Sequence, residues 1–309
     1  MRITQTFLSL LGLFFVQQSL ALDLDEAVLG APVEIYKGDT VEFKDIIGKK
    51  PVYLKFWASW CGTCLEQMNH LQDTYQEYAD DLEILSVNIW MNETEEMLEA
   101  TETEFGLTVP IAVDRTGELT RAFDLIATPY HVLIDRDGDV VHRGHNADNN
   151  LDRKIEILAA REKSGLPTIP LTPASGKTVD IFGESGEVSV LFFTAAWCDW
   201  YLEDSRPSMS RACVQAQRSM NKVHELLPDL NLLGVASRSW TGENELQEYI
   251  EKYAVKHPIA IDETNDAFFA LKVKTFPTMV VMKNGKEVYR TSTLDSVDYL
   301  TKRIRQYTD

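Results

Sequence analysis

Two cysteines that directly follow an apolar segment constrain this chain most. Residues 52–57 predict a buried strand, and the motif 60–64 (Trp-Cys-Gly-Thr-Cys) follows where a helix would begin. Two residues between the cysteines bring both sulfur atoms within one helical turn. The free N–H groups and the positive dipole end of a helix N-terminus stabilise a thiolate, which is the species that attacks a disulfide. The pattern therefore predicts thiol–disulfide exchange at Cys61 and Cys64.

A zinc site or a structural disulfide would use the same spacing. Zinc requires about four ligands, and no second closely spaced Cys pair or Cys/His pair accompanies this motif. A predicted strand, the motif and a predicted helix also coincide, which is typical of a redox site. We therefore favour the redox interpretation and expect neither a metal nor another cofactor.

The segment 56–64 is similar to the active site of thioredoxin-like proteins of the periplasmic TlpA type. Further segments follow in the order of that family: 81–88 as the next strand, then Val113-Asp114, Ala127-Thr128-Pro129 and 133–138. The resemblance covers residues 30–160 and rests on spacing and order as well as on the motif. It implies an α/β thioredoxin-like fold, with a mixed central sheet flanked by helices, and activity as a protein-disulfide reductase or thiol–disulfide oxidoreductase.

The resemblance also implies roles for individual residues. Cys61 forms a mixed disulfide with a protein thiol or disulfide substrate, and Cys64 resolves it. Trp60 shields one side of the pair. Thr128 and a cis Pro129 present the substrate backbone, because a cis bond before proline leaves the neighbouring main-chain edge free to pair with an extended peptide.

One position departs from the thioredoxin pattern. Thioredoxins keep a buried acid six residues before the first cysteine, where it helps to move the proton of the second thiol. This chain has Lys55 at that position and Phe192 at the corresponding position of its second half. We expect another base, or water, to deprotonate Cys64. Glu66 is close in the sequence but is expected to be a solvated helix residue.

The second half of the chain repeats landmarks of the first. Residues 191–198 align with 54–61, and 229–235 echo 81–87. One long repeat indicates two domains rather than a solenoid, which needs at least three short units. We therefore predict two tandem thioredoxin-like domains. The predicted division is a signal peptide (1–21), a domain with the Cys pair (22–162), a Pro-rich linker without helix or strand (163–173) and a second domain with a degenerate site (174–309).

The repeat places a second, altered site at Cys198. Tyr201 occupies the position that corresponds to Cys64, and the next cysteine is Cys213. Three interpretations of Cys198 and Cys213 stay open: a redox pair with unusual spacing, a static disulfide, or two free thiols. Spacing alone decides neither their connectivity nor their role.

Two further expectations concern the surroundings of this second site. Residues 202–211 are expected to bulge over the active-site face, ahead of a helix from 212 to 226. Pro277 aligns with Pro129 at an offset of 148 residues, so we expect both prolines to be cis.

The first 21 residues predict a secretory signal peptide. Arg2 is a short basic start, residues 7–16 form an apolar core too short to span a membrane, and 19–21 (Ser-Leu-Ala) form a cleavage site. No later segment approaches the roughly 20 apolar residues of a membrane span. We therefore expect an exported protein in a compartment that permits disulfides, which is the periplasm in a Gram-negative bacterium. The formal charge of −18 argues against nucleic acid and anionic membrane surfaces as partners.

The favoured function is an exported thiol–disulfide oxidoreductase that reduces protein disulfides. Gly62-Thr63 resembles the dipeptide of reducing family members, and a reductant outside the cytoplasm needs electrons from a membrane thiol carrier. Two alternatives stay open. The first is a copper(I)-delivery protein in which His70 or His131 joins the two thiolates, and the second is a substrate-binding adaptor with a vestigial second site.

Strands and helices are expected to alternate within each half, as in α/β proteins. Tight turns at 136–138 and 284–285 predict two hairpins. The expected helices are 65–78, 93–105, 151–162, 212–226, 243–253 and 297–307, and the expected strands include 52–57, 131–134, 139–143, 279–283 and 286–290.

Overall fold

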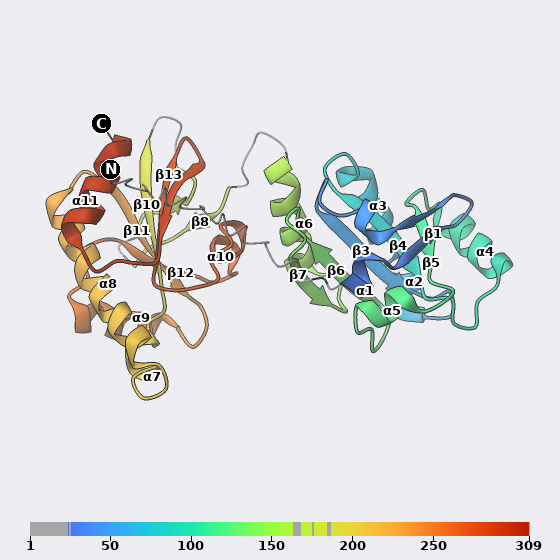
Figure 1. Cartoon of the computed structure of the whole chain (residues 1–309), viewed down its shortest axis with the longest axis horizontal. Coiled ribbons are helices and arrows are strands. Elements are labelled where there is room, and N and C mark those ends of the chain that lie inside the picture. The colour runs from blue at the N-terminus through green and yellow to red at the C-terminus, as the bar shows by residue number, and fades with distance from the viewer. Residues whose placement is uncertain (1–23, 25, 163–167, 175, 184–186, 309) are drawn as a thin grey trace, which may run out of the picture.

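Two mixed β-sheets with flanking helices occupy opposite ends of the molecule (Figure 1). The computed structural model describes residues 24, 26–162, 168–174, 176–183 and 187–308. The predicted signal peptide, 1–21, lies outside these residues. We call residues 24–162 the N-terminal half and residues 168–308 the C-terminal half. The expected α/β class, with mixed sheets flanked by helices, is confirmed.

The N-terminal half is built on a seven-stranded sheet of order β2-β1-β5-β4-β3-β6-β7. β3 pairs in parallel with β4 and antiparallel with β6. The strands are β1 (Pro32–Ile35), β2 (Thr40–Glu42), β3 (Val52–Trp57), β4 (Glu83–Asn88), β5 (Ile111–Val113), β6 (Tyr130–Ile134) and β7 (Val140–Gly144). The helices are α1 (Glu26–Leu29), a 3-10 turn (Phe43–Asp45), α2 (Gly62–Glu66), α3 (Met68–Tyr78), α4 (Glu95–Phe105), α5 (Glu118–Ala122) and α6 (Asn149–Glu162).

The C-terminal half repeats the central part of this topology. Its five-stranded sheet has the order β12-β11-β10-β13-β14, which corresponds to β5-β4-β3-β6-β7. The strands are β8 (Pro170–Leu171), β9 (Val179–Asp180), β10 (Val188–Thr194), β11 (Asn231–Ser237), β12 (Ile259–Asp262), β13 (Thr278–Lys283) and β14 (Lys286–Thr291). The helices are α7 (Cys198–Tyr201), α8 (Pro207–Leu226), α9 (Glu243–Tyr253), α10 (Asp266–Ala270) and α11 (Val297–Thr308).

Central strand β3 is buried at all six positions, because helices cover both faces of its sheet. Successive side chains alternate between the two faces. Tyr53 and Trp57 join the core cluster that includes residues of α3 and α6. Val52, Leu54 and Phe56 join the cluster on the other face, with residues of α1 and α5. The same alternation places Lys55 on the face of Tyr53 and Trp57, and its amino group there reaches main-chain oxygens of residues 64 and 67.

Three sequence-based expectations need correction. The helix expected over 65–78 is two helices, because Gln67 (φ −100°, ψ 7°) interrupts it between α2 and α3. The helix expected from 212 begins at Pro207, since proline is favourable in the first turn of a helix. Only residues 202–206 therefore separate α7 from α8, and residues 207–211 of the predicted bulge are helical instead. In the predicted linker, Pro170–Leu171 forms strand β8, which pairs with β9.

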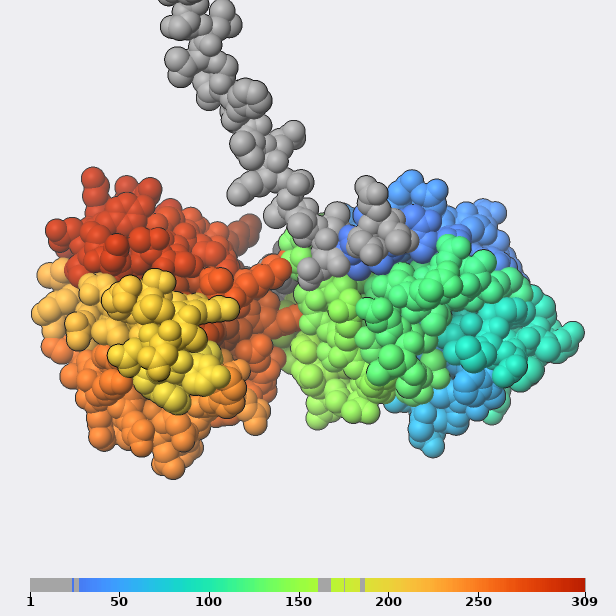
Figure 2. All heavy atoms as spheres, turned by 60° about the horizontal axis from the view of Figure 1, so that its bottom comes forward, coloured from blue at the N-terminus to red at the C-terminus, as the bar shows by residue number. Residues whose placement is uncertain are grey.

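The two halves meet at α6 and α10 (Figure 2). Ile157 of α6 is fully buried within a core cluster of the C-terminal half. Phe269 of α10 in turn packs against a core cluster of the N-terminal half. Arg153 of α6 adds an ion pair with Asp266 at 3.0 Å and donates a hydrogen bond to the carbonyl of Thr168 at 2.7 Å. Apolar and polar contacts therefore both hold the halves together.

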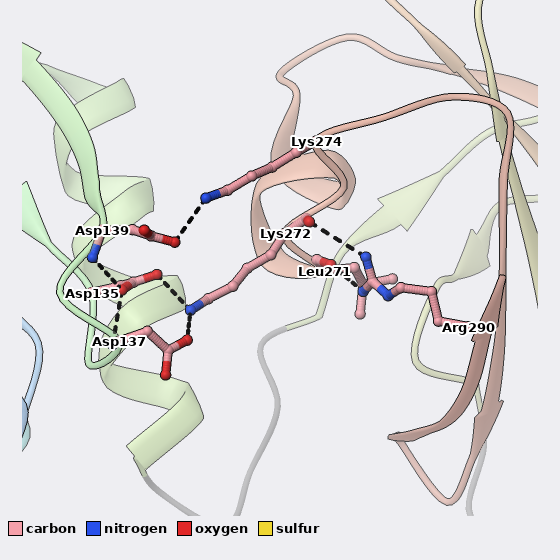
Figure 3. A network of polar contacts seen from close by, with 7 residues as sticks. All are labelled: Asp135, Asp137, Asp139, Leu271, Lys272, Lys274 and Arg290. Carbon is pink, nitrogen blue, oxygen red and sulfur yellow. Dashed lines mark hydrogen bonds and ion pairs between the residues drawn. The ribbon is translucent and has the colours of Figure 1, made fainter. Parts of the chain in front are cut away.

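A group of acids and lysines extends this contact (Figure 3). Lys272, just after α10, reaches the buried Asp135 (Nζ–Oδ2 2.5 Å) and Asp137 in the turn between β6 and β7. Lys274 pairs with Asp139 at 2.8 Å. Asp135 also accepts the N–H groups of Asp137 and Asp139, so hydrogen bonds within the turn hold it in addition to the lysines.

Candidate active site

Cys61 and Cys64 form a disulfide at the start of α2, shortly after β3 ends. Their Cα atoms lie 5.2 Å apart. Cys61 is the N-cap residue of α2, and its Sγ accepts the N–H of Cys64 at 3.3 Å. After reduction, a sulfur in this position is stabilised as a thiolate by the helix start. The two sulfur atoms thus come together where the sequence predicted them.

The two cysteines differ in how far they can be reached. Cys61 keeps 7% of its surface exposed, whereas Cys64 is completely buried. An external thiol or disulfide therefore meets Cys61 first, and Cys64 can react only with its neighbour.

Exposed apolar side chains lie at the edge of the sheet where the Cys pair is placed. Trp60 is half exposed, and its Nε1 donates to the carbonyl of Met91 at 2.6 Å. Met91 follows β4, and Ile126, which is 88% exposed, precedes β6. Because β3 and β4 are parallel and β6 is antiparallel to them, all three segments reach the same edge. A polypeptide substrate would meet an apolar surface here.

Both predicted cis peptide bonds are present, at Thr128-Pro129 and at Phe276-Pro277. In the N-terminal half, Tyr130 of β6 lies opposite Phe56 of β3. Pro129 therefore sits at the end of β6 that adjoins the end of β3, on the same side as the Cys pair. The structure brings Pro129 to the place that the resemblance implied.

Ser59 and Glu93 brace the segment between β3 and α2. The Glu93 carboxylate accepts the N–H of Ser59 at 2.5 Å and its hydroxyl at 2.7 Å. This pair was missed in the sequence, where Glu93 was expected to begin a helix that starts at Glu95 instead. The bond holds the loop that carries Trp60 and Cys61.

Lys55 lies directly beneath the motif and is completely buried. Its Nζ donates to the carbonyl of Gln67 at 2.8 Å and to that of Cys64 at 3.3 Å, and Met68 Sδ lies at 3.9 Å. Burial lowers the pKa of this amino group to about 7. Glu66, by contrast, is exposed, as expected.

A buried hydrogen-bonded chain adjoins Lys55. Tyr53 Oη and His131 Nδ1 are 2.8 Å apart, and His131 Nε2 lies 2.9 Å from Gln67 Oε1. Burial, and next the neighbouring Lys55, lower the pKa of His131 to about 3. His131 is therefore neutral near pH 7 and orients Gln67 at the break between α2 and α3. In the sequence, the only sign of this group was that residues 53 and 55, two positions apart on a predicted strand, share one face of the sheet.

Cys198 and Cys213 also form a disulfide, with Cα atoms 6.2 Å apart. It joins the start of α7 to α8 and is enclosed by Trp197, Leu202, Met209 and Phe276. Cys198 is completely buried and Cys213 keeps 4% of its surface. Tyr201, in the position that corresponds to Cys64, is instead half exposed. The structure pairs the two cysteines, in contrast to the reading of two free thiols.

Aromatic side chains cover this second site. The Trp197 ring lies within 5.1–5.6 Å of the rings of Trp240, Phe276 and Tyr201. Trp200, Tyr201 and Trp240 are each at least half exposed. We call these three residues and Trp197 the aromatic surface. It lies over the face that corresponds to the Cys61 site, because Trp197 and Pro277 correspond to Trp60 and Pro129.

The described ranges contain no group of three or more His, Cys, Asp or Glu side chains placed to hold a metal ion. His131 is engaged at both ring nitrogens, and His70 Nε2 contacts Asp152 at 2.6 Å. Within the same ranges, no helix combines the length and apolar composition needed to cross a bilayer.

Comparison with known proteins connects this site to a family. A model of the Redoxin family matches residues 35–157, which include the Cys pair and Pro129. Thiol-disulfide oxidoreductase ResA of Halalkalibacterium halodurans is 30% identical over 148 residues, or 47% of this chain and 82% of that protein. The ResA protein of Geobacillus kaustophilus is 32% identical over 125 residues, or 40% of this chain and 70% of that protein. Among solved structures, StoA from Bacillus subtilis matches at 24% identity and a TM-score of 0.34, over 38% of this chain and 90% of that one.

Proposed function

Because the chain belongs to the redoxin family of thioredoxin-like proteins, we propose that it is a protein thiol–disulfide oxidoreductase whose catalytic cysteines are Cys61 and Cys64. One observation carries the proposal. The more exposed sulfur, Cys61, caps α2 and accepts a main-chain N–H, while its partner Cys64 is buried behind it. This asymmetry separates an attacking sulfur from a resolving one.

The proposed reaction reduces a protein disulfide in two exchange steps. The Cys61 thiolate attacks one sulfur of the substrate disulfide, and the other substrate sulfur leaves as a thiolate. Cys64 then attacks Cys61, the substrate leaves as its second thiolate, and the Cys61–Cys64 disulfide forms. Thr128 and Pro129 lie where an extended substrate backbone would pair, and Trp60 shields one side of the sulfur atoms.

We place this reaction outside the cytoplasm and in the reducing direction. The N-terminal sequence supports export by a cleaved signal peptide, and Gly62-Thr63 supports a reductant. A reductant in that compartment draws electrons from a membrane thiol carrier, which would reduce Cys61–Cys64 after each cycle.

A trapping experiment tests the catalytic assignment. In the Cys64→Ser variant, the second step is blocked, so mixed disulfides should accumulate on Cys61 when the reduced variant meets unfolded proteins that contain disulfides. Non-reducing gels and peptide mapping would detect them. The Cys61→Ser variant is the matched control and should trap none. Equal trapping by both variants would contradict the assignment of Cys61 as the attacking residue.

We further propose that the chain comprises two tandem thioredoxin-like domains, the second with an altered site. The repeated strand order and the second cis proline support this division. The enclosed Cys198–Cys213 disulfide supports a structural role, and the aromatic surface supports a recognition role for the second domain. Copper(I) delivery has no comparable support, because the engaged His131 is not free to bind a metal.

The structural role of the second disulfide predicts a loss of stability. A disulfide that closes a loop of about 15 residues stabilises a fold by roughly 3 kcal/mol, and Cys198 and Cys213 are 15 positions apart. The Cys198→Ala/Cys213→Ala variant should lose about 2–4 kcal/mol in urea unfolding but keep parental insulin reduction. Loss of that activity in a variant that remains folded would instead favour a redox relay between the two sites.

A further inference from the structure

A buried amine lies under the resolving cysteine without a carboxylate beside it. Lys55 Nζ contacts two main-chain oxygens and a thioether sulfur. One of these oxygens belongs to Cys64 itself. Burial is the cause that lowers the pKa of this amine, and among the described residues no carboxylate pairs with it to oppose that effect. Burying a cation without a counter-ion costs folding free energy. A lysine at this position is therefore better explained by a functional role than by packing.

The two oxygens that Lys55 holds lie at the break between α2 and α3. Carbonyl groups at a helix C-terminus lack partners and carry partial negative charge, which a lysine can satisfy. Both oxygens also accept main-chain N–H groups, from Gln67 and from Leu71. Lys55 is thus an additional donor that fixes the main chain immediately after the Cys pair.

We propose that Lys55 is a positioning residue for Cys64, which fixes the main chain behind this cysteine and whose positive charge stabilises the Cys64 thiolate in the second exchange step. In that step, the Cys64 thiol gives its proton to water, and the thiolate forms a bond to Cys61 Sγ. The bond between Cys61 and the substrate breaks, and the substrate thiolate takes up a proton from water. The inference rests on the proposed function of Cys61 and Cys64.

The ammonium group of Lys55 is close enough to Cys64 to stabilise a thiolate there. Nζ lies 3.3 Å from the carbonyl oxygen of Cys64, and the side chains of Cys64 and Lys55 are both completely buried. Opposite charges interact much more strongly there than in water. A thiolate on Cys64 therefore favours the protonated amine, and the protonated amine favours the thiolate.

Two titratable groups that lie near Lys55, His131 and Tyr53, stay neutral near pH 7. His131 of β6 has its pKa lowered to about 3, chiefly by burial. Burial raises the pKa of Tyr53 on β3 far above its usual range. On α3, His70 pairs with Asp152 of α6 and is charged only when protonated. A His70→Asn substitution in every protein compared removes its contribution.

A two-phase reaction measures the effect on Cys64. Ellman's reagent releases one chromophore when Cys61 attacks it and a second when Cys64 resolves the mixed disulfide. Stopped-flow traces from pH 5 to 9, in the Cys198→Ala/Cys213→Ala background, give both rates. In Lys55→Met, the second phase at pH 7 should be at least about tenfold slower than in the parent, and its midpoint should move up by about one pH unit. Lys50→Met removes a lysine that also donates to a main-chain carbonyl, that of Ala79, and should match the parent.

The outcomes separate the inference from the proposed function. A missing first phase in all proteins would contradict the redox role of Cys61. A normal first phase with an unchanged second profile in Lys55→Met would overturn the role of Lys55. Lys55→Gln keeps a donor without the charge, so parental behaviour of this variant would overturn the electrostatic part.

A measurement on the unmutated protein guards against misfolded variants. The ¹³Cε signal of Lys55 can be followed against pH in the oxidised and reduced protein. Its midpoint should be higher after reduction, because a thiolate then lies close to the amine. Equal midpoints in the two states would show that Lys55 and the Cys pair are not coupled and would overturn the inference.

Discussion

Replacing Cys61 with serine is expected to lower the rate of insulin-disulfide reduction by more than about 10³-fold. The variant lacks the attacking nucleophile, and the buried Cys64 cannot take its place. Serine fills the same place at the start of α2 but cannot form a disulfide. The fold should survive, since serine is close to cysteine in size and Cys61 keeps 7% of its surface exposed. Insulin turbidity with dithiothreitol as the electron source measures the rate.

The Cys198→Ala/Cys213→Ala variant is the matched control for this experiment. It removes the disulfide of the other half and should keep the parental rate. If Cys61→Ser retained activity and the control lost it, the active disulfide would be the one in the C-terminal half. The proposed assignment of the two sites would then be reversed.

Replacing Lys55 with methionine is expected to change how the stability of the oxidised protein depends on pH. The pKa of the amine falls from its usual value of 10.5 to about 7 in the folded protein. Between these values the unfolded chain binds a proton that the folded chain does not, so the free energy of unfolding rises with pH across this range. As pH falls from about 10 to 7, Lys55 should cost the parent on the order of 4 kcal/mol, at about 1.4 kcal/mol per pKa unit.

Lys55→Met removes this cost, because methionine has a similar shape and no charge. The two carbonyl oxygens that lose Lys55 keep their main-chain N–H partners, so the hydrogen-bond penalty is small. Urea unfolding at pH 7, 8.5 and 10 should show the variant gaining on the parent as pH falls. Lys50→Met, at a less buried lysine, should follow the parent. A parallel pH dependence of parent and Lys55→Met would mean that the amine stays protonated in the folded state.

Local patterns predicted most elements of this protein. The helix over 243–253 and the hairpin across Asn284-Gly285 agree with the structure, because a periodic apolar face and two residues with positive φ need only their neighbours. The errors occur where distant residues intervene. The break at Gln67 lies where Lys55, 12 positions away, reaches the main chain, and β8 exists because residues 170–171 find a partner at 179–180.

The two disulfide sites also differ in how much of each the sequence predicted. The spacing of Cys61 and Cys64 predicted their contact, since one helical turn spans it. The repeated landmarks predicted a second cis proline at Pro277. Cys198 and Cys213 meet only because α8 folds back beside α7, and the cover of aromatic rings over them comes from three separate segments. Spacing could not distinguish among the three readings of this pair.

The sequence by itself determined the α/β class, the repeated order of strands and the position of the Cys pair at a helix start, because these depend on patterns within a few residues. Only the tertiary structure decided which side chains lie behind that pair and how the halves meet. Lys55 lies under Cys64 because β3 is covered by the helices that follow it. Lys272 meets Asp135 although 137 positions separate them. Contacts of this kind depend on the packing of whole elements, which no local pattern specifies.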